Sequence, residues 1–118
     1  MYSKPLTITT ITINSYNHEE LISFYIELGI GITKFVNDKN KINFYYKIEG
    51  IKYIINPVED ILQSTKNLSL SFAVVDLEGY YNILLEIGAE VVEKIQLEDE
   101  YKIIVKDPGG NFIELYER

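Results

Sequence analysis

The C-terminal stretch that decides the fold reads Asp107-Pro108-Gly109-Gly110-Asn111-Phe112-Ile113-Glu114-Leu115-Tyr116. Pro108 favours the first corner of a turn, and the two glycines after it can adopt the positive φ angles of the following turn positions. After Asn111 the residues alternate as in a half-buried strand, with Phe112, Glu114 and Tyr116 on one face and aliphatic residues on the other. If its face is buried, a carboxylate between two aromatic residues must be paired, protonated or bound to a metal ion. Glu114 is therefore the first candidate site residue.

The chain contains an internal repeat with an offset of 59 residues. This offset relates the helix-ending residues Gly29 and Gly88, the predicted N-caps Asn17 and Asp76, and the turn glycines Gly50 and Gly109. Glu20 completes a capping-box pattern with Asn17. Each half is predicted to contain a strand, a helix and three further strands. The predicted strands are 6–14, 31–36, 41–48, 51–56, 68–75, 89–96, 101–106 and 111–116, and the predicted helices are 18–28 and 77–87.

The repeat predicts an α+β fold of two tandem βαβββ modules in a single domain spanning residues 1–118. The first module covers about residues 6–57 and the second about 68–118, with a polar linker at 58–67 that contains one helical turn near Ile61. Each module alone would cover one sheet face with a single helix and leave much of its apolar surface exposed. The two modules are therefore expected to pack together.

Composition excludes several classes of function. The net charge is −7 and the basic residues are scattered, so no face suited to nucleic acid is predicted. No apolar run approaches the roughly 20 residues of a membrane span, and the N-terminus lacks a signal-peptide pattern. The absence of cysteine excludes thiolate sites and fits a cytoplasmic protein.

The tandem repeat and the Asp-Pro-x-Gly-Asn-x-x-Glu-Leu ending resemble the vicinal oxygen chelate superfamily, the glyoxalase, bleomycin-resistance and extradiol-dioxygenase group. Further matches are Phe24–Tyr25 with Leu28–Gly29, and Val74–Val75–Asp76–Leu77. The resemblance implies a cupped, partly open mixed β-barrel with helices outside, a concave groove for a small molecule, and a homodimer. It also implies metal ligands on the first and last strands of each half, Glu114 being the last.

The other three positions of that implied metal set carry poor ligands. The 59-residue offset assigns Ile55 as the match to Glu114, and Ser69 and Thr10 as the positions on the first strands. Iron, zinc and nickel prefer several histidines or carboxylates. The only histidine, His18, is predicted to be exposed on the first helix, so one subunit cannot supply two histidine ligands. We therefore expect no metal and no other cofactor.

The groove residues follow from strand alternation. Thr10, Thr12, Ser69 and Ser71 would form a polar floor around Glu114, and they equally suit an ordinary central strand. Aromatic walls would come from Tyr53, Phe112 and Tyr116, for which core packing is the alternative. Which face of strand 41–48 lines the groove is left open. The predicted ligand-binding set is Thr10, Thr12, Tyr53, Ile55, Ser69, Ser71, Phe112, Glu114 and Tyr116.

These residues favour a glyoxalase/bleomycin-resistance-like protein that binds a small aromatic or cationic molecule without metal-dependent catalysis. Glu114 would serve as a counter-ion. The alternative is a glyoxalase-like lyase, isomerase or dioxygenase with a displaced metal site, or a metal-free enzyme with Glu114 as catalytic base. A structural or regulatory domain with a closed groove is the third hypothesis.

Overall fold

The structure is a computed structural model that describes residues 6–117, so both ends of the predicted domain fall outside the described residues. Its elements closely follow the predicted ones. In chain order they are β1 (Thr10–Ser15), α1 (His18–Glu27), β2 (Thr33–Val36), β3 (Ile42–Ile48), β4 (Ile51–Pro57), η1 (Ile61–Gln63), β5 (Ser69–Val74), α2 (Leu77–Glu86), β6 (Glu90–Gln96), β7 (Tyr101–Lys106) and β8 (Phe112–Glu117). Within residues 6–117 no helix is long and apolar enough to cross a membrane.

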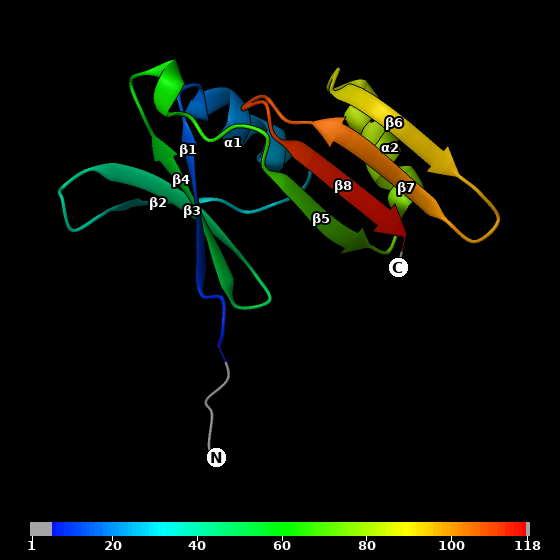
Figure 1. The fold of residues 1–118 in the computed structure, drawn as a ribbon, viewed down its shortest axis with the longest axis horizontal. Coiled ribbons are helices and arrows are strands. Elements are labelled where there is room, and N and C mark those ends of the chain that lie inside the picture. Colours follow the sequence, from blue (N-terminus) through cyan, green and yellow to red (C-terminus); the bar gives the residue numbers. More distant parts are fainter. Residues whose placement is uncertain (1–5, 118) are drawn as a thin grey trace, which may run out of the picture.

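The strands form two four-stranded mixed sheets with the same topology. The first sheet has the order β1-β4-β3-β2 and the second has the order β5-β8-β7-β6. The parallel pairs are β1 with β4 in the first sheet and β5 with β8 in the second. All other neighbouring strands are antiparallel. Figure 1 shows the two sheets side by side, with α1 between them in this view and α2 behind the second sheet. The predicted α+β fold of two βαβββ modules is confirmed, and the sheets are cupped without closing into a barrel.

One face of each sheet is buried and the other is open. In the first sheet, Ile13, Tyr46, Tyr53 and Ile55 are buried together with apolar residues of α1. In the second sheet the buried side chains are Ile103, Val105, Ile113 and Leu115, together with Leu77 and Leu84 of α2. Since successive side chains of a strand point to opposite faces, all intervening residues lie on the open faces. The alternation predicted for β8 is confirmed.

The last hairpins of the two modules differ in length, and this difference changes the predicted groove. Ile48 pairs with Ile51 across the two-residue turn Glu49–Gly50, whereas the second hairpin encloses residues 107–111 between Lys106 and Phe112. Gly50 at φ 84° therefore matches Gly110 at φ 85°, and the interpretation that Gly109 is its match is wrong. The strands β4 and β8 are consequently related by an offset of 60 residues.

A shift of one residue moves every side chain to the other face. In the second sheet, Glu114 pairs with Ile104. The residue that matches Ile104 at the 59-residue offset is Tyr45, and Tyr45 pairs with Ile54 in the first sheet. The true match of Glu114 is thus Ile54. The prediction that Tyr53 and Ile55 line the groove is wrong, because their exposed fractions are 8% and 0% and both lie in the core.

The turn at residues 107–111 also holds the two modules together. Oδ1 of the buried Asp107 accepts hydrogen bonds from the backbone N–H groups of Gly109 (2.9 Å) and Asn111 (3.0 Å). Its Oδ2 accepts a hydrogen bond of 3.2 Å from the hydroxyl of Tyr25 on α1. Asn17 donates a 2.6 Å hydrogen bond from Nδ2 to the carbonyl oxygen of Pro108.

The predicted capping role of Asn17 is wrong for its side chain. Asn17 makes no side-chain capping hydrogen bond to α1, because its Oδ1 accepts a 3.3 Å hydrogen bond from the hydroxyl of Ser15 while its Nδ2 donates to the turn of the other module. Asp76, at the equivalent position of α2, does cap its helix by accepting a 3.1 Å hydrogen bond from the backbone N–H of Gly79. The two modules therefore share a fold but use this position differently.

Candidate functional site

The open face of the second sheet gathers five of the predicted site residues. Ser69 pairs with Phe112, Ser71 with Glu114, and Ala73 with Tyr116, so these side chains share one face of β5 and β8. Ser69 and Ser71 are exposed, Phe112 and Glu114 are half-buried, and Tyr116 is 41% exposed. We call this surface, with Lys102 and Ile104 of β7, the second open face.

Glu114 has two partners on the second open face. Its Oε1 accepts a hydrogen bond of 3.1 Å from the hydroxyl of Ser71, and its Oε2 lies 3.7 Å from Nζ of Lys102. Lys102 is closer to Glu100, at 3.1 Å, and this hydrogen bond, together with the charges of Glu100 and Glu114, raises the pKa of Lys102. A partly exposed ion pair of this kind stabilises the fold little. The carboxylate is thus held in place and can exchange Lys102 for the cation of a ligand.

A shallow pocket of about 330 Å³ lies over this end of the second sheet. Its walls include Glu100, Tyr101, Lys102, Glu114 and Tyr116. Tyr101 donates a hydrogen bond to Glu78, which raises the pKa of Tyr101 to about 12. The pocket therefore combines carboxylates with two tyrosines, a combination suited to a cation or an aromatic ring.

The residues present do not fit the metal that the fold implies. At the four family positions the structure provides the hydroxyls of Thr10 and Ser69, the aliphatic Ile54 and the carboxylate of Glu114. In the part of the chain that is described, no three His, Cys, Asp or Glu side chains are grouped as metal ligands. His18 instead stacks on Phe44, with 5.8 Å between ring centroids.

Thr10 and Thr12 lie on the open face of the first sheet, which we call the first open face. It consists of Thr10, Thr12 and Asn14 on β1, Lys52, Ile54 and Asn56 on β4, and Asn43, Tyr45 and Lys47 on β3, with Phe35 at the β2 edge. No residue of this face lines the pocket beside Glu114. Within one chain, the two threonines are therefore not brought together with Glu114.

Only Thr10 and Thr12 of the first open face were predicted from the sequence, and the missed residues include Lys52, Ile54 and Tyr45. Lys52 and Ile54 were assigned to the wrong face through the one-residue register error, although the two-residue turn Glu49–Gly50 is a signal that could have revealed it. Tyr45 was left undecided because Phe44, Tyr45 and Tyr46 are consecutive. The structure places Tyr45 opposite Ile54 on the open face, with Phe44 and Tyr46 toward the core.

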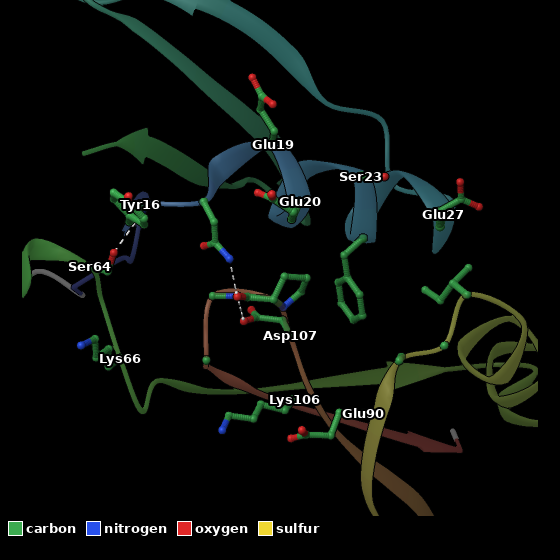
Figure 2. Close-up of a pocket in the computed structure, with 18 of the residues that line it drawn as sticks. Tyr16, Glu19, Glu20, Ser23, Glu27, Ser64, Lys66, Glu90, Lys106 and Asp107 are labelled. Atoms are coloured by element: carbon green, nitrogen blue, oxygen red, sulfur yellow. Dashed lines mark hydrogen bonds between the residues drawn. The ribbon is translucent and has the colours of Figure 1, made fainter. Parts of the chain in front are cut away.

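A cleft of about 1010 Å³ that was not predicted lies between the modules. α1 forms one wall, and the turn at 107–110 and the start of β6 form the other (Figure 2). The figure shows the carboxylates of Glu19 and Glu27 pointing away from the cleft and Glu90 lying beside Lys106. The carboxyl group of Asp107 accepts hydrogen bonds from the backbone of the turn. Burial raises the pKa of this carboxyl group, and the backbone hydrogen bonds oppose that rise. Of the polar groups that line the cleft, Asn17 and Asp107 form hydrogen bonds that hold the modules together.

Two comparisons of the sequence with known proteins gave different results. No protein-family model matches the chain. A curated relative, the metallothiol transferase FosB of Shouchella clausii, is 28% identical over 117 residues, covering 92% of this chain and 78% of the relative.

Solved structures share the fold over the whole chain. A glyoxalase family protein from Bacillus anthracis has a TM-score of 0.75 at 21% identity, covering 100% of this chain and 99% of that one. TnmS3, an antibiotic binding protein from Streptomyces sp. CB03234, has a TM-score of 0.77 at 16% identity, covering 98% of both chains. The chain therefore has the glyoxalase-like fold of two tandem βαβββ modules.

Proposed function

We propose that this protein binds a small aromatic molecule on its open sheet faces, with Glu114 as counter-ion for a cationic group and without metal-dependent catalysis. The observation that carries this proposal is the arrangement around Glu114. The carboxylate is held by Ser71, lies next to Lys102, and is flanked by Phe112 and Tyr116 on an exposed face. The antibiotic-binding activity of the structural neighbour TnmS3 is in line with this class of function.

The proposal includes a homodimer that completes the groove. The radius of gyration is 15.8 Å, whereas a compact domain of this length is expected to have about 13.5 Å. Both open faces remain uncovered within the chain, as expected if a second copy supplies the opposite wall. Light scattering that gives only the monomer mass at micromolar concentration would remove the dimer from the proposal.

The Glu114 site predicts selective binding of aromatic cations. Aminoacridine, which is cationic at neutral pH, should bind more tightly than acridine, which is neutral and has the same rings. Glu114→Gln should weaken binding of the cation about tenfold, because the ligand loses a charge-assisted contact. Isothermal titration of both compounds checks this.

Glu86→Gln is the matched control, because it removes the same charge from the exposed end of α2. Equal affinities of the wild type and Glu114→Gln for aminoacridine would contradict the assignment of Glu114. Failure of either compound to bind would count against the proposed function as a whole.

A second candidate function is a transferase or lyase activity, favoured by the relationship to the metallothiol transferase. It would require a metal at a displaced site or Glu114 as a base. Elemental analysis of the untagged protein separates the two functions. A stoichiometric transition metal would overturn the metal-free proposal, whereas substoichiometric metal and no change in melting temperature on adding nickel, zinc, iron or manganese would support it.

A further inference from the structure

The first open face is organised in three chemically distinct rows that run across its strands. One row consists of Lys47, Lys52 and Thr10, which pair across β3, β4 and β1. The next row contains Tyr45, Ile54 and Thr12, and the third contains Asn43, Asn56 and Asn14. The face therefore changes from cationic to apolar to amide along the strands.

The cationic row is unfavourable by itself. Lys47 and Lys52 are direct cross-strand neighbours, and like charges in this position repel. Among residues 6–117 the ion pairs within 4.0 Å involve only Lys102, so neither Lys47 nor Lys52 has a carboxylate partner at that distance. This arrangement occurs in a chain whose net charge is −7. An anion paired with either ammonium group would relieve the repulsion.

Aromatic rings hold one of the two ammonium groups over the face. Nζ of Lys52 lies 4.7 Å from the ring centroid of Tyr45 and 5.8 Å from that of Phe35. The two rings contact each other edge to face at 5.5 Å. Lys52 thus extends along the sheet toward the apolar row, where its charge can reach a ligand that lies flat on the face.

The amide row is preorganised by its own hydrogen bonds. Nδ2 of Asn43 donates to Oδ1 of Asn56 at 2.8 Å, and Nδ2 of Asn56 donates to Oδ1 of Asn14 at 2.9 Å. Asn43 is 4% exposed and its Oδ1 accepts a 3.3 Å hydrogen bond from Nδ2 of Asn37, so its amide is fixed, whereas the half-buried Asn14 and Asn56 keep hydrogen-bonding capacity for a ligand. The row ends opposite Phe35 at the sheet edge.

We infer that the first open face binds an aromatic anion, with its carboxylate or similar group paired with Nζ of Lys52. Its ring lies against Tyr45 and Ile54, and a polar substituent reaches the asparagine row. Four residues of strand separate the first row from the third, or about 13 Å, which is the length of a substituted two-ring compound. This inference rests on the proposed function and adds the anionic group of the ligand and the face that recognises it.

Hydroxynaphthoate and its carboxamide are the probes that test the inference, because the carboxamide keeps the rings and the hydroxyl but lacks the negative charge. The acid should bind, and the amide should bind about tenfold more weakly. Lys52→Gln should weaken binding of the acid about tenfold while leaving binding of the amide unchanged, and Lys52→Arg, which keeps the charge, should restore most of the affinity. Isothermal titration measures all of these affinities, and thermal melts establish that each variant is folded.

Lys39→Gln is the control, because Lys39 is an exposed lysine in the turn between β2 and β3. Equal binding of acid and amide, or unchanged binding of the acid by Lys52→Gln, would overturn the inference. If aminoacridine binds through Glu114 while hydroxynaphthoate does not bind, the proposed function stands and this inference fails. Loss of the dimer in Lys52→Gln without any binding of hydroxynaphthoate would assign the face to a second copy of the chain, which also overturns it.

Discussion

Replacing Ile55 by alanine is expected to lower the free energy of unfolding by about 2–5 kcal/mol, the usual cost of a large-to-small change in a packed core. Ile55 has no exposed surface and belongs to the helix-covered face of β4. Its neighbour Ile54 lies half-buried on the open face, so Ile54→Ala should cost less than about 1 kcal/mol. Urea denaturation of both variants measures the two costs.

The comparison tests the register between the two modules. If β4 followed the 59-residue offset, Ile55 would match Glu114 and line the groove, and Ile54 would be the core residue. A larger loss of stability for Ile54→Ala than for Ile55→Ala would therefore contradict the register described above. Because both variants remove the same atoms from adjacent residues, each serves as the control for the other.

Asp107→Ala is expected to lower the free energy of unfolding by about 2–4 kcal/mol, because three donors, two of them in buried hydrogen bonds, lose their acceptor. These donors are the backbone N–H groups of Gly109 and Asn111 and the hydroxyl of Tyr25. Asp107→Asn should cost much less, because its amide oxygen can accept from the backbone and its NH₂ group can donate to the tyrosine oxygen. Equal losses in the two variants would contradict this account of the turn.

The stability of the wild type and that of Asp107→Asn should also depend differently on pH. Burial raises the pKa of Asp107 in the folded protein above the ordinary 3.8. The folded state then binds the proton more tightly than the unfolded state, so this group's contribution to stability is fully present below pH 3.8 and is lost as the pH rises through the folded pKa. Asp107→Asn should therefore gain stability relative to the wild type between acid and neutral pH, which urea denaturation across that range measures. A relative loss over the same range would contradict the raised pKa.

Local signals in the sequence predicted most of the fold. Gly29 and Gly88 end the helices at positive φ, and the alternation after Asn111 identifies β8 and its buried face. These features depend on backbone geometry and on apolar periodicity, both of which are visible in a single chain. The use of Asn17 could not be predicted, because its partner is the carbonyl of Pro108, far away along the chain.

The candidate site was predicted less completely for a related reason. Five site residues were correctly placed together, because the family resemblance implies positions on the first and last strands and strand alternation adds their neighbours: Ser69, Ser71, Phe112, Glu114 and Tyr116. On β4 the groove positions were wrong, since the loop length of a hairpin sets its register: four residues separate Lys47 from Lys52, whereas five separate the equivalent Lys106 from Phe112. The pairing of Lys47 with Lys52 depends on that register, so the cationic row was not predicted.

The proposed function requires that aromatic small molecules bind to the open sheet faces. Amide chemical shifts from ¹⁵N-labelled protein, titrated with aminoacridine and then with hydroxynaphthoate, test it most directly. We predict shifts for aminoacridine around Ser71, Glu114 and Tyr116, and for hydroxynaphthoate around Tyr45, Lys52 and Ile54. Shifts confined to α1 and the turn at 107–110, or no shifts with either compound, would contradict the proposed function.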